Sequence, residues 1–222
     1  MMIRAGLCIV GWLVAGGAYA ASPSVNVERG NIVCHAVGRA LVLTQDGQNS
    51  EPVLSPDGHT VAFIHQIKSS TDPEFPQDAI NALWVGDCLT GKSRQLQGPI
   101  SKKDMFGTAG HPVFSLDGTH IYVSLVPGGN YLIIRQISVA TGEQKPVADA
   151  ELVGVFRTGP YRGDLLATQH TDMTDSKGQH YGGYPYYIFK PDGQVVHRID
   201  GSEDWTDKAM KRWLAEKGWQ VW

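Results

Sequence analysis

Two copies of one motif decide the fold of this sequence: Pro52-Val-Leu-Ser-Pro-Asp-Gly58 and, sixty positions later, Pro112-Val-Phe-Ser-Leu-Asp-Gly118. Each copy leads into a segment in which side chains alternate with a period of two, Thr60–Ile64 and His120–Ser124. Such alternation is typical of β-strands, and an Asp-Gly pair between strands predicts a tight turn. Both copies therefore predict a strand, a turn and a second strand.

The second halves of the two units also match, with Leu83–Lys92 corresponding to Ile134–Glu143. The first unit carries about nine extra residues in the polar stretch from Gln66 to Ala79, as expected of a loop insertion. A third, weaker unit comprises Gly159–Gly163, Asp164–Thr168 and Tyr186–His197. Before the first unit, the outer hairpin of a further one comprises Asn31–Gly38 and Arg39–Thr44. The sequence therefore predicts an all-β protein of about three and a half four-stranded, propeller-type blades.

The recurring turn residues have a structural explanation. In Pro-Asp-Gly, Pro presets the backbone angle φ, Asp hydrogen-bonds its own backbone, and Gly adopts a positive φ at which other side chains clash. We therefore interpret these Asp and Gly residues as turn formers and not as a functional site.

The C-terminal segment changes from a strand period to a helix period. Ser202 is a suitable N-cap, with Glu203 and Asp204 in the first turn, and the helix is expected to end near Gly218. Its apolar face comprises Trp205, Ala209, Met210, Trp213 and Leu214, and its polar face Lys208, Lys211, Arg212, Glu216 and Lys217. Residues 202–222 thus form an amphipathic helix and tail, with Trp219 and Trp222 beyond the helix.

The N-terminus has the pattern of a secretory signal peptide. Arg4 precedes an apolar run, and Ala18-Tyr-Ala20 is a small-residue exit, so cleavage is expected after Ala20. The apolar run is shorter than the roughly 20 residues that span a bilayer, and Cys8 is discarded with it. We expect residues 21–201 to form the repeat domain of a periplasmic or secreted protein with no transmembrane segment.

Charge and cysteine usage narrow the possible partners. The net charge is −3, and the basic residues are scattered, so a nucleic-acid partner is not expected.

After cleavage only Cys34 and Cys88 remain, and an oxidising compartment favours a disulfide between them over two buried thiols. Face-to-face blades lie about 10 Å apart, whereas a disulfide needs Cα atoms within about 7 Å, so the bond requires a displaced first hairpin.

The motifs resemble those of one known repeat. The residues that carry the resemblance are Leu43–Gly47, Pro52–Phe63, Leu83–Val85 and Thr90–Leu96. They resemble the TolB-type propeller repeat, and they are similar to the propeller domains of prolyl-oligopeptidase-like peptidases. The similarity is strongest over residues 41–147, weaker from 150 to 200, and absent in the helix. Family propellers close with six or more blades, and TolB carries a separate N-terminal domain.

The resemblance implies a non-catalytic periplasmic module that binds a protein or a cell-envelope component. The alternative is a periplasmic hydrolase of peptides or glycans, with His170, Asp172, Asp175 and His180 converging at one end of the array.

An incomplete set of blades leaves terminal faces to be covered. We expect an open arc capped by the Trp-rich helix in a monomer, with a strained ring or a toroid of two chains as the alternatives.

No motif of a common hydrolase, metalloprotease or nucleotide-binding loop occurs in the sequence, and we expect no enzyme activity and no cofactor. The stretch His170–His180 fits neither an EF-hand nor a zinc motif, so no metal site is assigned. The tyrosines that follow it, Tyr181, Tyr184 and Tyr186, are the candidate binding surface, although tyrosines on a strand are more often part of a core.

Overall fold

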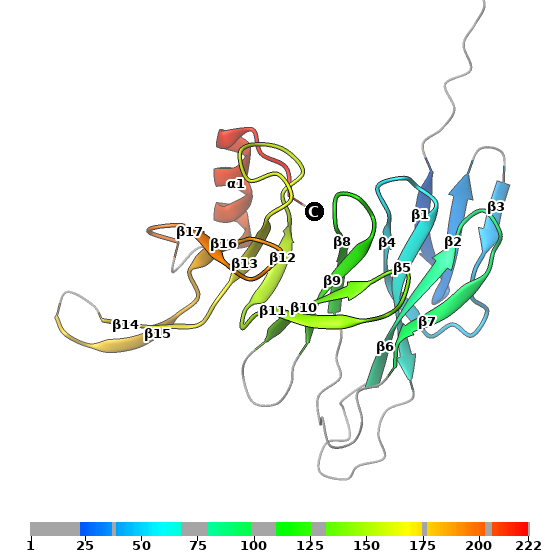
Figure 1. Ribbon diagram of the computed structural model, residues 1–222, viewed down its shortest axis with the longest axis horizontal. Helices are drawn as coiled ribbons and strands as arrows, with labels where there is room; N and C mark the ends of the chain where they lie inside the picture. The colour runs from blue at the N-terminus through cyan, green and yellow to red at the C-terminus, as the bar shows by residue number, and fades with distance from the viewer. Residues whose placement is uncertain are drawn as a thin grey trace, which may run out of the picture.

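The computed structural model describes residues 23–36, 39–67, 80–98, 110–125, 132–174, 177–202 and 206–221. These residues form antiparallel sheets and one C-terminal helix, which confirms the predicted fold class (Figure 1). The predicted signal peptide, Asp175 and Trp205 lie outside the described residues. No helix among the described residues is long and apolar enough to cross a membrane.

Three consecutive four-stranded sheets correspond to the three predicted repeats. The first contains β4 (Asn49–Leu54), β5 (Thr60–Ile67), β6 (Ile80–Asp87) and β7 (Ser93–Gln97). The second contains β8 (Gly110–Phe114), β9 (His120–Leu125), β10 (Ile133–Ser138) and β11 (Gln144–Ala148). The third contains β12 (Glu151–Val155), β13 (Leu165–Thr168), β16 (Tyr186–Phe189) and β17 (Val195–Arg198). We call them blades 1, 2 and 3.

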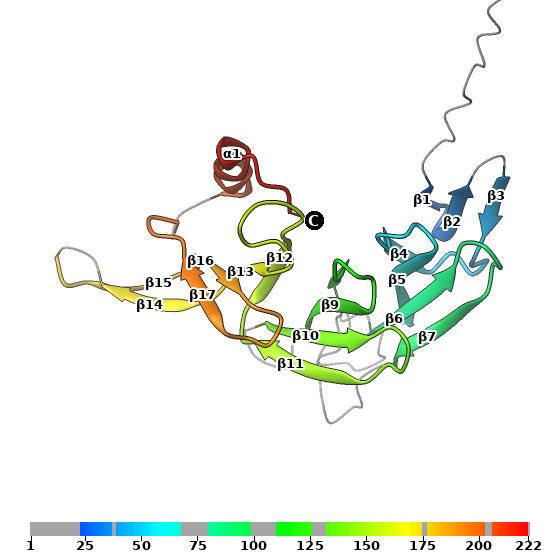
Figure 2. The ribbon, with the colours of Figure 1, turned by 45° about the horizontal axis from the view of Figure 1, so that its top comes forward.

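A partial blade precedes blade 1, and it has one strand more than the expected hairpin. β1 (Ser24–Glu28) pairs with β2 (Asn31–Ala36), which pairs with β3 (Arg39–Val42). The insertion in blade 3 forms a separate ribbon of β14 (Thr171–Thr174) and β15 (His180–Gly183), which projects from the molecule (Figure 1). The partial blade and the helix lie at opposite ends of an open arc (Figure 2).

The turns have the chemistry predicted from the motif. The Asp57 carboxylate accepts hydrogen bonds from the Ser55 hydroxyl and the His59 N–H. Asp117 accepts the equivalent bonds from Ser115 and Thr119. The Ser115 hydroxyl, followed by the N–H and hydroxyl of Thr119, lowers the Asp117 pKa to about 2. The glycines that follow both aspartates have φ values of 76° and 71°. These residues therefore shape the backbone, as predicted.

Apolar side chains fill the space between successive sheets because each strand presents alternate residues to its two neighbours. Leu165 and Ala167 of β13 contact blade 2, whereas Leu166 between them belongs to a separate cluster under the helix. In β16, Phe189 faces blade 2 and Ile188 faces the helix. The core is thus a series of layers between the sheets.

The helix α1 (Asp207–Lys217) covers the outer face of blade 3 (Figure 2). Met210 and Leu214 are buried there, and all five residues of the predicted polar face are exposed. Trp213 is only partly buried and lies edge-on to Trp219, with ring centroids 5.3 Å apart. Gly218 ends the helix with a φ of 68°, as predicted.

The predicted start of the helix is wrong. Thr206 is the N-cap, and its hydroxyl accepts the Ala209 N–H at 3.3 Å. Ser202 is instead fully buried, where its hydroxyl accepts the Tyr186 N–H at 2.9 Å and donates to the Ile199 carbonyl. Ser202 therefore satisfies backbone groups at the end of blade 3, and the helix begins four residues later.

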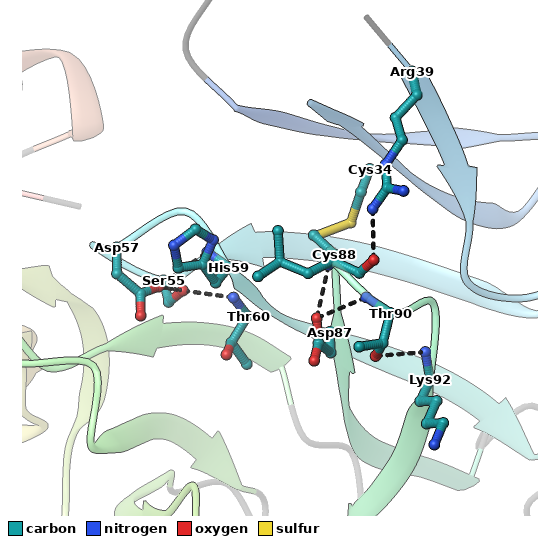
Figure 3. The surroundings of a disulfide bond; sticks show 11 residues. Cys34, Arg39, Ser55, Asp57, His59, Thr60, Asp87, Cys88, Thr90 and Lys92 are labelled. Atoms are coloured by element: carbon teal, nitrogen blue, oxygen red, sulfur yellow. Dashed lines mark hydrogen bonds between the residues drawn. A yellow bond between two sulfur atoms is a disulfide. The ribbon is translucent and has the colours of Figure 1, made fainter. Parts of the chain in front are cut away.

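A disulfide joins the partial blade to blade 1 (Figure 3). The Cα atoms of Cys34 and Cys88 are 5.6 Å apart, within the range that a disulfide requires. Cys88 follows the last residue of β6 and lies in the turn to β7, so it is not restricted to the spacing of two packed sheets. This position explains why the objection from sheet spacing does not apply.

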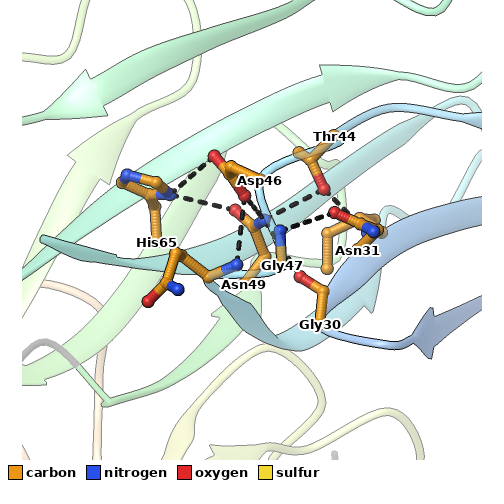
Figure 4. A network of polar contacts seen from close by, with 9 residues as sticks. Gly30, Asn31, Thr44, Asp46, Gly47, Asn49 and His65 are labelled. Atoms are coloured by element: carbon orange, nitrogen blue, oxygen red, sulfur yellow. Dashed lines mark hydrogen bonds and ion pairs between the residues drawn. The ribbon is translucent and has the colours of Figure 1, made fainter.

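A network of hydrogen bonds around Asn49 also joins the partial blade to blade 1 (Figure 4). The buried Asn49 amide donates to the Gly30 carbonyl at 3.1 Å and to the Thr44 hydroxyl at 3.0 Å. Its carbonyl oxygen lies 3.1 Å from Nδ1 of His65. A Cβ on Gly30 would lie 2.1 Å from the Gly47 carbonyl oxygen, so this approach requires glycine. The partial blade is therefore held by covalent, polar and apolar contacts.

Candidate functional site

A cavity of 630 Å³ lies where the first strands of the three blades meet the C-terminal helix. The contacts of β4 with β8 and of β8 with β12 place these first strands side by side. The cavity is lined by Glu51, Pro52, Val53, His111, Pro112, Val113, Glu151, Leu152, Val153, Thr168, Tyr186, Asp207, Met210, Lys211, Leu214 and Val221. We call it the central cavity.

The backbone is irregular where the first strands reach this cavity. Glu51 and His111 occupy equivalent positions, each before the repeated proline, and have φ values of 50° and 53°. Their strands lose the regular register there, between Ser50 and Val53 and between Gly110 and Val113. Residues other than glycine seldom adopt positive φ, and such strain is concentrated at functional sites. The two distortions aim a carboxylate and an imidazole toward each other.

These two side chains interact across the blade boundary. The Glu51 carboxylate accepts the backbone N–H of His111 at 2.6 Å, and the same oxygen lies 3.7 Å from Nδ1 of the imidazole. The side chains are 41% and 74% exposed, so a ligand can reach both. Glu51 therefore links blades 1 and 2 while it remains accessible from the cavity.

The described lining is more acidic than basic. It has three carboxylates, Glu51, Glu151 and Asp207, and one ammonium group, that of Lys211. Burial, followed by the charges of Asp207 and Glu151, raises the pKa of the Tyr186 hydroxyl. The arrangement suits a ligand with donor groups or positive charge.

A second cavity of 380 Å³ adjoins the first at the base of the β14–β15 ribbon. Its described lining is Leu132, Asp149, Ala150, Glu151, Thr168, Gln169, His170 and Tyr184. Glu151 and Thr168 line both cavities, so the two are neighbours on one surface. The rings of His170 and Tyr184 meet edge to face, with centroids 5.3 Å apart.

The three candidate tyrosines do not form one surface. Tyr184 is 55% exposed in the second cavity, and Tyr181 is 42% exposed on β15. Tyr186 is only 4% exposed and lines the central cavity, so it is separate from the exposed Tyr181 and Tyr184. It lies on an inner strand of blade 3, and strand alternation turns its ring toward the layer under the helix.

The segment considered for a hydrolase or metal site is spread along the ribbon. His170 lies at its base, Asp172 is on β14, and His180 is on β15 with Nδ1 3.1 Å from the Thr174 hydroxyl. Across residues 23–221, as far as the structure describes them, no group of three or more His, Cys, Asp and Glu side chains could hold a metal ion.

Sequence reasoning did not find Glu51, His111 and Glu151. A signal was available for the first two, because both stand immediately before the repeated Pro-Val pair, sixty positions apart. The first strand of each blade lines the concave side of such an array, so the residue before each repeat is a candidate by position.

Comparison with known proteins identifies the fold. No protein-family model matches the chain, and no curated protein matches it. The structure is similar to Porphyromonas gingivalis dipeptidyl peptidase 4, with a TM-score of 0.56, 13% identity, and coverage of 81% of this chain and 31% of that one. It is also similar to the tricorn protease, with a TM-score of 0.55, 14% identity, and coverage of 81% of this chain and 16% of that one.

The β-propeller domain of the Trilobed protease from Pyrococcus furiosus also matches, with a TM-score of 0.48 and 15% identity over 76% of this chain and 48% of that one. The chain spans less than a third of the first two proteins. The fold is that of β-propeller blades, with structural similarity to propeller domains of peptidases.

Proposed function

We propose that the chain is an exported, non-catalytic repeat protein of TolB type that binds a protein or a cell-envelope component through the central cavity. The observation that carries this proposal is the convergence of three first strands and the helix on one open, partly apolar cavity. Repeat arrays use such concave surfaces for binding.

The chemistry of the lining indicates the kind of partner. Exposed carboxylates and the neighbouring apolar wall of Val53, Val113 and Leu214 favour an extended segment with both basic and apolar side chains. The peptidases that share the fold act in chains several times longer than this one, so their activities are not transferred.

Site-specific crosslinking in the exporting cell tests the proposal. A photoreactive amino acid at His111, 74% exposed in the cavity, should give a discrete adduct with another protein or an envelope component. The matched position is Leu89, which is 51% exposed outside the described cavity lining and should give none. Reversing the charge at the shared wall, Glu151→Lys, should weaken the His111 adduct.

Equal adducts from both positions would contradict binding at the cavity. Cleavage of the captured partner by the purified protein would contradict the non-catalytic assignment and favour a hydrolase.

A further inference from the structure

The partial blade lacks one strand position that all three full blades fill. In blades 1 to 3, the first strands β4, β8 and β12 each pair with a second strand, β5, β9 or β13. In the partial blade, Leu41 of β3 lies against Gly91 in the β6–β7 turn, just as Leu96 of β7, a fourth strand, lies against Gly142 in the β10–β11 turn. β3 is therefore the fourth strand of the partial blade, β2 the third and β1 the second. Among the described residues, the first-strand position beside β1 is empty.

Strand geometry shows which backbone groups face that position. The N–H of Ile32 donates to Thr44 and its carbonyl accepts from Leu43, so both groups point toward β3. The backbone N–H and carbonyl groups of successive residues point to opposite edges of a strand. Those of Val33 therefore point toward β1, where the partner of Val33 is Asn26. The backbone groups of Val25 and Val27 therefore face the open edge. This edge presents two N–H and two carbonyl groups to an added strand.

The side chains around the open position are apolar. Val25 and Leu54 pack against the cluster that joins the partial blade to blade 1, and β1 contacts β4. Val27 lies on the same side of β1 as Val25, yet 43% of it is exposed. A strand placed beside β1 would cover Val27 and continue this layer. Figure 2 shows β1 next to β4 on the concave side of the arc.

The edge is held in place before any partner arrives. The disulfide fixes β2 near one end of the partial blade, and the Asn49 network fixes the turn that follows β1 at Gly30 (Figures 3 and 4). A preordered edge reduces the entropy lost on binding.

We propose that an extended segment of a partner protein binds here by β-strand addition, as the antiparallel first strand of the partial blade. This mode obtains affinity from backbone hydrogen bonds and specificity from alternate side chains. The segment would carry apolar residues at every second position, facing Val25, Val27 and Leu54. This surface is separate from the central cavity and does not depend on it.

Every described strand already belongs to a sheet, and cleavage after Ala20, an expectation on which this inference rests, would leave little chain before β1. Cleavage leaves Ala21 and Ser22 before Pro23, whereas β4 has six residues. The C-terminal residues are engaged on blade 3, where Val221 pairs with Phe156. The proposal therefore takes the strand from another molecule.

The test uses the processed protein, whose intact mass is measured first, and a synthetic peptide with the sequence of residues 149–157. This peptide contains β12, the chain's own first strand of blade 3, without proline. At saturation it should slow amide hydrogen exchange of Val25 and Val27 at least about tenfold and leave Asn26 nearly unchanged. A scrambled peptide should have no effect.

Two variants at one position separate backbone pairing from side-chain contact. Val27→Pro removes the outward N–H, and proline is tolerated on strand edges, so the fold should survive while peptide affinity falls at least about tenfold. Val27→Ala keeps the N–H and should weaken binding only about threefold.

Three outcomes would overturn the proposal. They are amides of Val25 and Val27 already protected without peptide, no protection at millimolar peptide, or equal affinities of the two variants. Two further outcomes would also contradict a partner protein as the occupant: retention of residues 1–20, which could supply the strand from the same chain, and concentration-dependent dimerisation through this edge, which would supply it from a second copy. A negative result here leaves crosslinking at His111 unaffected, so the two binding surfaces are tested separately.

Discussion

Replacing Leu214 with alanine tests whether the helix is part of the folded core. Leu214 is 7% exposed and packs with Phe156 and Ile188 in the layer over blade 3. Buried Leu→Ala changes cost about 2 to 5 kcal/mol, the sum of lost burial and the remaining void. Leu214 also borders the central cavity, which lets the void merge with solvent, so we expect a loss of about 3 kcal/mol.

Urea unfolding followed by circular dichroism measures this loss. For a chain of this size, a change of about 3 kcal/mol corresponds to a fall in melting temperature of about 6 to 12 °C. Leu89→Ala is the matched control, because it is the same chemical change at a residue that is 51% exposed, and it should cost less than about 1 kcal/mol.

Equal, small losses from the two variants would refute the docking of the helix. Truncation after Ser202 provides a second test, because it would uncover Phe156 and Ile188, both 0% exposed. The truncated protein should aggregate. A soluble, equally stable truncated protein would mean that the helix is a free tail.

Three further predictions concern processing, the disulfide and acid stability. Export should remove residues 1–20, and an intact mass that still includes them would refute cleavage after Ala20. The unreduced, unfolded protein should show no free thiol at Cys34 or Cys88, and two titratable thiols would show that no bond exists. Cys88→Ser should lower the unfolding free energy by about 4 kcal/mol, because the bond closes a loop with a sequence separation of 54 residues. Because the pKa of Asp117 is lowered from 3.8 to about 2, its contribution to the unfolding free energy is present above pH 4 and is lost as the pH falls toward 2. This contribution should amount to about 1 kcal/mol after solvent screening and should disappear in Asp117→Ala. If the unfolding free energies of the two proteins changed with pH in parallel, Asp117 would make no such contribution.

The blades could be predicted because local rules and tertiary packing agree in them. The Asp57-Gly58 and Asp117-Gly118 turns form from their own residues, and the flanking strands alternate as a two-faced sheet requires. The end of the helix at Gly218 was predictable for the same reason, since glycine adopts the left-handed conformation that closes a helix.

Other features depend on contacts that the local sequence does not contain. Ser202 is a residue type that favours an N-cap, but in the folded chain its hydroxyl is buried. There it accepts the Tyr186 N–H and donates to the Ile199 carbonyl. Tyr184 and Tyr186 differ in exposure because only Tyr186 is within a paired strand, and the cluster Tyr181–Tyr187 does not show where that strand begins.

Light scattering of the processed protein during gel filtration tests the central claim, that one chain forms a capped arc with an open concave side. In a single chain, Glu51 and His111 are accessible and the helix covers the outer face of blade 3. The outer edge of β1 pairs with no described strand. The mass of one chain across a range of concentrations is the predicted result. A stable mass of two chains would contradict it, because two arcs closed into a toroid would enclose the cavity that we propose as the binding site.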